Sequence, residues 1–198
     1  MRYLSLLFLF FLILLGYCYS SNETWKVRQQ IRFETPAGYT IPSKFSRILA
    51  LGHQGLLSDY LFLRTLTFMG GRNTLKQTMS EDDWNYVALS LDVVTDLDPY
   101  FVDPYFVAEG FLAWDAQKPD LANQILLKGV VSRSWDWRLP FFVGFNGFYF
   151  LKDFELASKF IMQASLMDGS PAYLQTLGAR LAYYGGKSKT ALLFLEQM

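Results

Sequence analysis

Residues 139–167 have the sequence LPFFVGFNGFYFLKDFELASKFIMQASLM, and this stretch decides the fold. Its first thirteen residues carry no charge, and six of them are Phe or Tyr. After Lys152 and Asp153, small and apolar residues recur at steps of three and four: Phe154, Ala157, Ile161 and Ala164. Such periodicity predicts an apolar helix over 138–151, a tight turn, and an amphipathic helix over 154–168.

The small residues of the second helix recur along the chain. Ala157 and Ala164 have counterparts 35 residues earlier and again 34 residues before that, and a last one follows 34 residues after Ala157. In chain order, these counterparts are Ala88, Thr95, Ala122, Gly129 and Ala191. The spacing resembles that of the tetratricopeptide repeat (TPR) family, whose units of about 34 residues form two antiparallel helices.

Other residues extend the resemblance over about residues 80–198. Phe154 fits the aromatic position at the family's turn, and Gly185-Gly186 fits the turn itself. The first-helix signature is matched in the last unit by Leu174, Leu177, Gly178 and Leu181. Gly144-Phe145 departs from the family's Leu-Gly pair, and Lys118-Pro119 departs from its turn. The resemblance implies an all-α fold, a TPR-like α-solenoid of antiparallel helix pairs over residues 44–198.

Residues 1–20 predict a signal peptide or a membrane anchor. Arg2 precedes an apolar run from Tyr3 to Tyr17, which is shorter than the roughly 20 residues that span a bilayer comfortably. Three alternatives stay open: cleavage after Ser20, a retained anchor, and a lipid on Cys18, which the bulky Tyr17 disfavours. Each places the remaining chain outside the cytosol, and we expect the periplasmic side of a bacterial membrane.

Residues 21–43 are polar and mixed, with Pro36, Gly38 and Pro42, and are predicted to be an extended spacer. Periodicity and stop signals then predict further helices. The first runs over Lys44–Met69 and is ended by Gly70-Gly71, and the next, Asp82–Leu97, follows the capping-box-like start at Ser80. The remaining ones cover Asp103–Ala116, 120–132, 171–184 and 188–198.

Nothing in the sequence points firmly to chemistry. There is no phosphate loop, no Gly-x-Ser-x-Gly context, no paired Cys/His set, and only one histidine, His53. Asp96, Asp98 and Asp103 suggest acid/base or calcium chemistry, but they lie where helix ends favour Asp, so we predict a capping role. We therefore expect no enzyme, cofactor or metal. The net charge of 0 gives no basic excess for nucleic acid.

The resemblance also implies a binding surface, because in this family the first helices of successive units line a concave groove that holds a peptide or protein segment. By register, the groove residues here are Phe106, Phe142, Asn146, Tyr149, Gln175 and Tyr183, together with Asp103, Gly110, Leu139 and Ala179. This set implies an apolar or aromatic ligand segment. The alternative is that Phe142 and Tyr149 only pack against the neighbouring unit.

The segment from Ala191 to Leu195 is apolar on all sides, whereas stacked repeats normally close with a polar-faced helix. We predict an interaction edge at Leu192, Leu193 and Leu195, for a second copy or another envelope protein. The resulting hypothesis is a non-catalytic scaffold that binds other envelope proteins or peptide segments. The alternatives are a small accessory subunit of a membrane complex, packed through the helix over 141–150, and, less favoured, a hydrolase.

Overall fold

A computed structural model describes the backbone of residues 2–34 and 40–196, and the side chains of 10–26, 40–194 and 196. Within these ranges the chain is helical and contains no strand. The elements are α1 (Arg2–Glu34), α2 (Ser43–Leu49), α3 (Gln54–Thr74), α4 (Glu81–Leu97), α5 (Asp103–Val107), the π-helix η1 (Ala108–Asp115), α6 (Pro119–Ser132), α7 (Arg138–Asn146), the π-helix η2 (Gly147–Leu151), α8 (Phe154–Ser165), α9 (Tyr173–Tyr184) and α10 (Ser188–Glu196).

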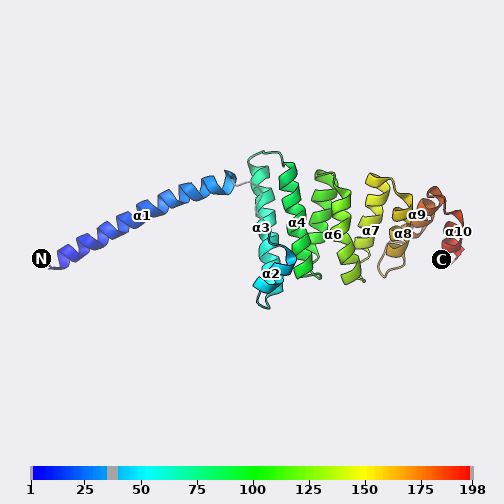
Figure 1. The fold of residues 1–198 in the computed structure, drawn as a ribbon, viewed down its shortest axis with the longest axis horizontal. Coiled ribbons are helices and arrows are strands. Elements are labelled where there is room, and N and C mark those ends of the chain that lie inside the picture. The colour runs from blue at the N-terminus through cyan, green and yellow to red at the C-terminus, as the bar shows by residue number, and fades with distance from the viewer. Residues whose placement is uncertain (1, 35–39, 197–198) are drawn as a thin grey trace.

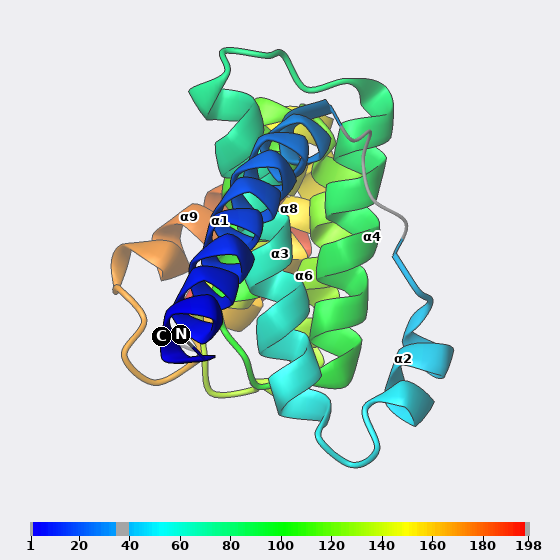
Figure 2. The same cartoon turned by 90° about the vertical axis from the view of Figure 1, so that its left-hand side faces the viewer.

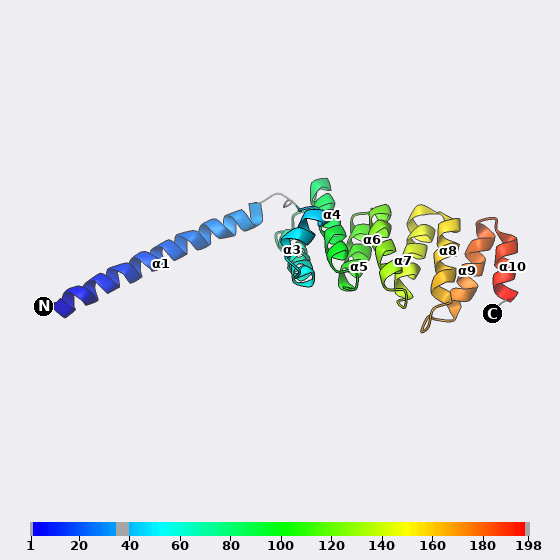
Figure 3. The same cartoon turned by 60° about the horizontal axis from the view of Figure 1, so that its bottom comes forward.

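Helices α3 to α10 stand side by side in a row, and each packs mainly on the helices before and after it (Figures 1 and 3). Helix α5 continues directly into η1, and α7 into η2, so each pair acts as one helix. The row is therefore a succession of antiparallel hairpins: α3 with α4, α5–η1 with α6, α7–η2 with α8, and α9 with α10. Helix α1 extends away from the α3 end of the row (Figure 1).

The turns within the last three hairpins repeat one backbone design. Each has a residue in the left-handed region, and these are Gln117 (φ 56°), Lys152 (φ 56°) and Gly186 (φ 77°). The N–H of the following residue donates back to the first helix at 2.7–2.8 Å: Lys118 to Leu112, Asp153 to Gly147, and Lys187 to Ala182. Such a left-handed residue ends a helix and satisfies its last carbonyls. The spacing of the turns thus matches the repeat of small residues in the sequence.

The repeated small residues lie where the helices meet. All of Ala88, Thr95, Ala122, Gly129, Ala157, Ala164 and Ala191 are buried, as the spacing predicts. Glycines mark the closest approaches: a Cβ on Gly144 would lie 2.8 Å from Cγ1 of Ile161, and one on Gly178 would lie 2.7 Å from Cγ of Met162. No side chain larger than hydrogen fits at these two positions without a shift of the neighbours.

Four predicted helix limits are wrong. The helix predicted over 154–168 ends at Ser165. Lys44–Met69 is two helices, because Leu51 (φ 47°) and Gly52 (φ 89°) break the backbone between α2 and α3. Gly70-Gly71 does not end α3, which continues to Thr74 and ends before the left-handed Lys76. Helix α9, the first helix of the last hairpin, begins at Tyr173 instead of residue 171. It follows a turn in which the Leu174 N–H donates to the Pro171 carbonyl. Ser80 does form a capping box, with Asp83 as its partner.

The segment 21–43 is not extended throughout, because α1 continues as a helix to Glu34. Local side-chain contacts support it: Thr24 Oγ1 donates to the Ser20 carbonyl at 2.7 Å, and Lys26 pairs with Glu23 at 2.7 Å. Part of the predicted spacer, residues 35–39, lies outside the described residues. In the described part of the chain, no helix combines the length and the apolar character that a membrane crossing requires.

Candidate functional site

Six aromatic side chains gather where the first helices of the two middle hairpins face each other: Phe106, Trp114, Phe142, Phe145, Tyr149 and Phe150. We call this set the aromatic surface. Phe106 meets Phe142 edge-to-face with ring centroids 5.7 Å apart. Trp114 stacks on Phe145 at 5.9 Å and on Tyr149 at 5.2 Å. The rings of α5–η1 thus lie directly against those of α7–η2, in arrangements that aromatic pairs favour.

The structure brings together three of the predicted groove residues, Phe106, Phe142 and Tyr149. Phe142 packs on Phe106, and Tyr149 packs on Trp114, so the alternative of packing between units also holds for them. This packing does not bury the rings completely, however, because 46% of the Tyr149 surface and 43% of the Trp114 surface stay exposed. The aromatic surface therefore joins the hairpins and still leaves part of Trp114 and Tyr149 exposed to solvent.

Asn146 is not a groove residue, which corrects the prediction. It is fully buried, and its Nδ2 donates to Glu109 Oε2 at 2.8 Å and to Asn123 Oδ1 at 3.0 Å. Helix α7 turns this side chain inward, towards η1 and α6, while Phe145 takes the outward place one residue earlier. Asn146 thus ties three helices together beneath the aromatic surface.

Glu109 is the acid in this buried polar cluster. Its burial raises the pKa of the carboxyl, and hydrogen bonds from Asn146 and from Trp114 partly offset the rise. The Oδ1 atom of Asn146 is buried without a hydrogen-bond partner. The cluster joins η1, α6 and α7 beneath the aromatic surface.

Two cations flank the aromatic surface. The guanidinium of Arg138 lies 4.8 Å from the Phe106 centroid, and Nζ of Lys152 lies 5.4 Å from that of Tyr149. Arg138 also donates two hydrogen bonds of 2.7 Å to the carboxylate of Asp136. Partial burial alone would raise the pKa of Asp136, but the hydrogen bonds and charge of Arg138 lower it overall. The arrangement suits a ligand with apolar or aromatic groups, and Lys152 adds a positive charge at one end.

Tyr183, another predicted groove residue, lies elsewhere. It lines a cavity of about 390 Å³ between α9 and α10, together with Thr176, Ala179, Arg180, Tyr184, Ser188, Ala191 and Leu192. We call this cavity the C-terminal groove. It joins Tyr183 to Leu192 of the predicted interaction edge, and Leu193 is also exposed. Gln175 is half-buried and does not line the groove. The side chain of Leu195 lies outside the described residues.

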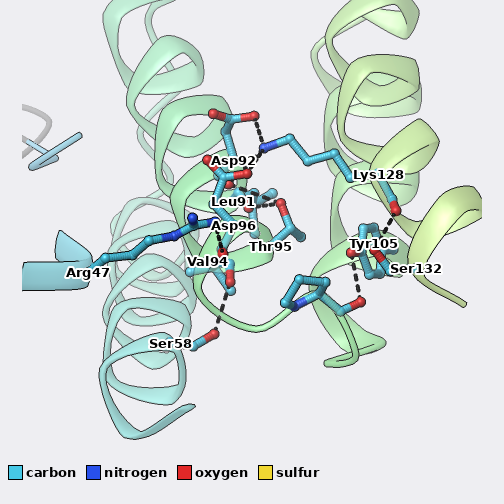
Figure 4. A network of polar contacts seen from close by, with 11 residues as sticks. Arg47, Ser58, Leu91, Asp92, Val94, Thr95, Asp96, Tyr105, Lys128 and Ser132 are labelled. Atoms are coloured by element: carbon cyan, nitrogen blue, oxygen red, sulfur yellow. Dashed lines mark hydrogen bonds and ion pairs between the residues drawn. The ribbon is translucent and has the colours of Figure 1, made fainter. Parts of the chain in front are cut away.

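The carboxylates near the α4–α5 connection form structural contacts (Figure 4). Lys128 of α6 reaches Asp92 at 2.5 Å and Asp96 at 2.7 Å on α4. Burial acts to raise the pKa of Asp96, but hydrogen bonds from Lys128 and Ser43 and nearby positive charges lower it. The role of Asp96 is therefore an ion pair, not the predicted helix cap. Among the described residues, no group of three His, Cys, Asp or Glu side chains is arranged to hold a metal ion.

Backbone carbonyls complete the network of Figure 4. Arg47 of α2 donates to the Asp96 carbonyl at 2.8 Å, and Ser58 of α3 donates to the Val94 carbonyl at 3.1 Å. The hydroxyl of Tyr105 donates to the Pro99 carbonyl at 3.0 Å. These contacts hold α2 and α3 on α4, and α5 on the turn before it.

Sequence reasoning missed Trp114, Phe145 and Glu109. A signal for Trp114 was present, because it lies 35 residues before Tyr149 and so occupies the same place in the preceding unit. No comparable signal marks Glu109, whose partners come from two other helices. Comparison with known proteins adds no relative: no family model, no curated protein and no solved structure matches the chain.

Proposed function

We propose that the row of hairpins is a TPR-like α-solenoid and that the protein is a non-catalytic scaffold in a bacterial envelope. It binds an apolar, aromatic-bearing segment of a partner on the aromatic surface and in the C-terminal groove. The proposal includes export across the membrane and a tether through the N-terminal segment. No cofactor takes part in this function.

One observation carries the proposal: nearly half of the Trp114 and Tyr149 side-chain surface stays exposed although both rings belong to a stacked cluster. Exposed aromatic rings held rigidly by neighbours offer large contact area at a low cost in side-chain entropy, and such residues dominate binding energies at protein interfaces. The buried contact from Glu109 to Asn146 stiffens the support beneath them.

The membrane-complex alternative is less well supported by the packing. It requires the helix over 141–150 to offer its Phe side chains to membrane-embedded partners. Phe142 and Phe150 instead pack on the core formed by α3 to α7, and Phe141 packs on the core of α8 and α9. The chain itself therefore covers much of this aromatic area.

Selection of peptides from a random library with the purified full chain tests the proposal. We expect enrichment of apolar peptides with aromatic residues, measured afterwards as dissociation constants by fluorescence anisotropy. Tyr149→Ala and Tyr183→Ala should weaken binding at their respective sites by about tenfold or more. The matched control is Tyr173→Ala, because Tyr173 is 62% exposed against 64% for Tyr183 but lies outside the C-terminal groove. No enrichment, or an equal loss in the control, refutes the proposal.

A further inference from the structure

The α3 end of the row exposes a set of large apolar side chains on its outer side. Helix α3 buries Ser58, Phe62, Thr65 and Met69 against the row. The opposite face carries Leu56, Tyr60 and Leu63, spaced four and three residues apart and all exposed. A helix of a water-exposed surface places polar residues on its outer face, and the three exposed apolar residues of α3 depart from that pattern.

Helix α2 also turns its large apolar residues outward. Ser46 and Ala50 are buried against the row, whereas Phe45, Ile48 and Leu49 are exposed. The contact of Arg47 with the Asp96 carbonyl holds α2 on α4 in this orientation, and Ser46 Oγ donates locally to the Ile41 carbonyl. The outward-facing apolar residues form one set, the N-terminal patch: Ile41, Phe45, Ile48, Leu49, Leu51, Leu56, Tyr60 and Leu63.

Helices α2 and α3, which carry most of the N-terminal patch, lie at the end of the row from which α1 extends (Figures 1 and 2). In α1, every apolar side chain from Phe10 to Leu15 is exposed. A helix that is apolar all round requires an apolar medium on every side. A single apolar medium at this end of the molecule would cover both α1 and the N-terminal patch.

The charge distribution identifies that medium. Residues 1–75 contain 8 Lys and Arg against 3 Asp and Glu, a net charge of +5, and residues 76–198 contain 10 against 15, a net charge of −5. Lys44 and Arg64 are exposed on α2 and α3, against one exposed acid on the same helices, Asp59. Anionic lipid headgroups attract basic residues near the membrane and repel acidic ones. This difference in net charge therefore favours contact of the α3 end, and not the rest of the row, with an anionic bilayer.

We propose that the N-terminal patch is a membrane-binding surface, which lies in the headgroup region of an anionic lipid bilayer. Phe45, Ile48, Leu56 and Leu63 enter the boundary between headgroups and acyl chains, and Lys44 and Arg64 meet lipid phosphates. This contact is a second one besides the N-terminal tether of the proposed function, on which it rests. It fixes the row with its α3 end at the membrane and its C-terminal groove away from it.

The test uses the full chain with an environment-sensitive fluorescent amino acid in place of Leu56. The matched control carries it in place of Leu166, because the two leucines are 71% and 72% exposed. Each protein is mixed with phosphatidylcholine vesicles that do or do not contain phosphatidylglycerol. We expect a blue shift at position 56 only, larger with the anionic lipid, quenched by a nitroxide near the lipid headgroup, and weaker at high salt.

In the chain labelled at position 56, Leu63→Glu should lower the ratio of docked to undocked label by at least about tenfold. Leu166→Glu should leave that ratio unchanged, because Leu166 is also exposed (72% against 61% for Leu63) but follows α8, outside the N-terminal patch. Vesicle binding without a shift at position 56 overturns the membrane surface while leaving the tether intact. Equal shifts at both positions also overturn it. A shift without vesicles, together with a doubled mass in sedimentation, would assign the patch to a second copy instead.

Discussion

The close contact between α7 and α8 predicts that Gly144→Ala destabilises the protein. A Cβ at this position would lie 2.8 Å from Ile161 Cγ1 and 3.0 Å from the backbone oxygen of Ala157. Ile161 is itself almost completely buried, so it has no room to withdraw. Overpacking of this kind costs up to about 3 kcal/mol, and the helix-propensity gain of alanine returns about 1 kcal/mol. We expect a net loss of about 2 kcal/mol in the free energy of unfolding.

The same substitution elsewhere supplies the control. Gly70 lies inside α3, and a Cβ added to it would have no neighbour within 4 Å, so Gly70→Ala should stabilise the protein by about 0.5–1 kcal/mol. Gly178→Ala should fall between the two, because the atom it meets, Cγ of Met162, belongs to a flexible side chain. Urea unfolding followed by circular dichroism, with the m-value checked for each variant, measures all three. A Gly144→Ala protein as stable as the parent refutes close nesting of the hairpins.

Three further predictions concern polar contacts and are checked by urea unfolding. Burial raises the pKa of Glu109, so its contribution to stability is complete at low pH and is lost as the pH rises from 4.5 through the raised value; Glu109→Gln should be increasingly stabilising over that rise. Lys128→Met should destabilise by about 1 kcal/mol at pH 7, and the difference should vanish well below pH 3.8 as Asp96 protonates. Tyr105→Phe should cost about 1 kcal/mol by leaving the Pro99 carbonyl unpaired, and should remove the phenol whose pKa is raised to about 12 from a spectrophotometric titration.

Periodicity in the sequence predicted the helices of the row well. The steps of three and four residues and the small residues 34–35 apart correspond to buried positions on successive second helices. This succeeded because both signals are local: an amphipathic pattern sets which side of a helix is buried, and a residue without a large side chain permits close approach wherever it recurs. The burial of Ala157 and Ala164 is the clearest example.

The candidate site was predictable only in part. Phe106, Phe142 and Tyr149 follow from register along first helices, and the structure brings them together. The place of Asn146 does not follow from register, because its partners Glu109 and Asn123 lie 37 and 23 residues away. The sequence pattern of a single helix predicts that such an amide lies at the surface. A buried hydrogen-bonding partner on another helix makes the interior equally suitable for it.

The sequence by itself determined that the chain forms helices, where most of them begin and end, and which small residues lie between them. Only the tertiary structure decided that α2 and α3 turn Ser46, Ser58 and Thr65 inward while Phe45, Ile48, Leu56 and Leu63 stay exposed. The physical reason is that the hydrophobic pattern of a helix marks one face but does not say what covers it. On α3, the hydrogen bond of Ser58 with the Val94 carbonyl and the packing of Phe62 and Met69 in the core lie on the face that meets the row.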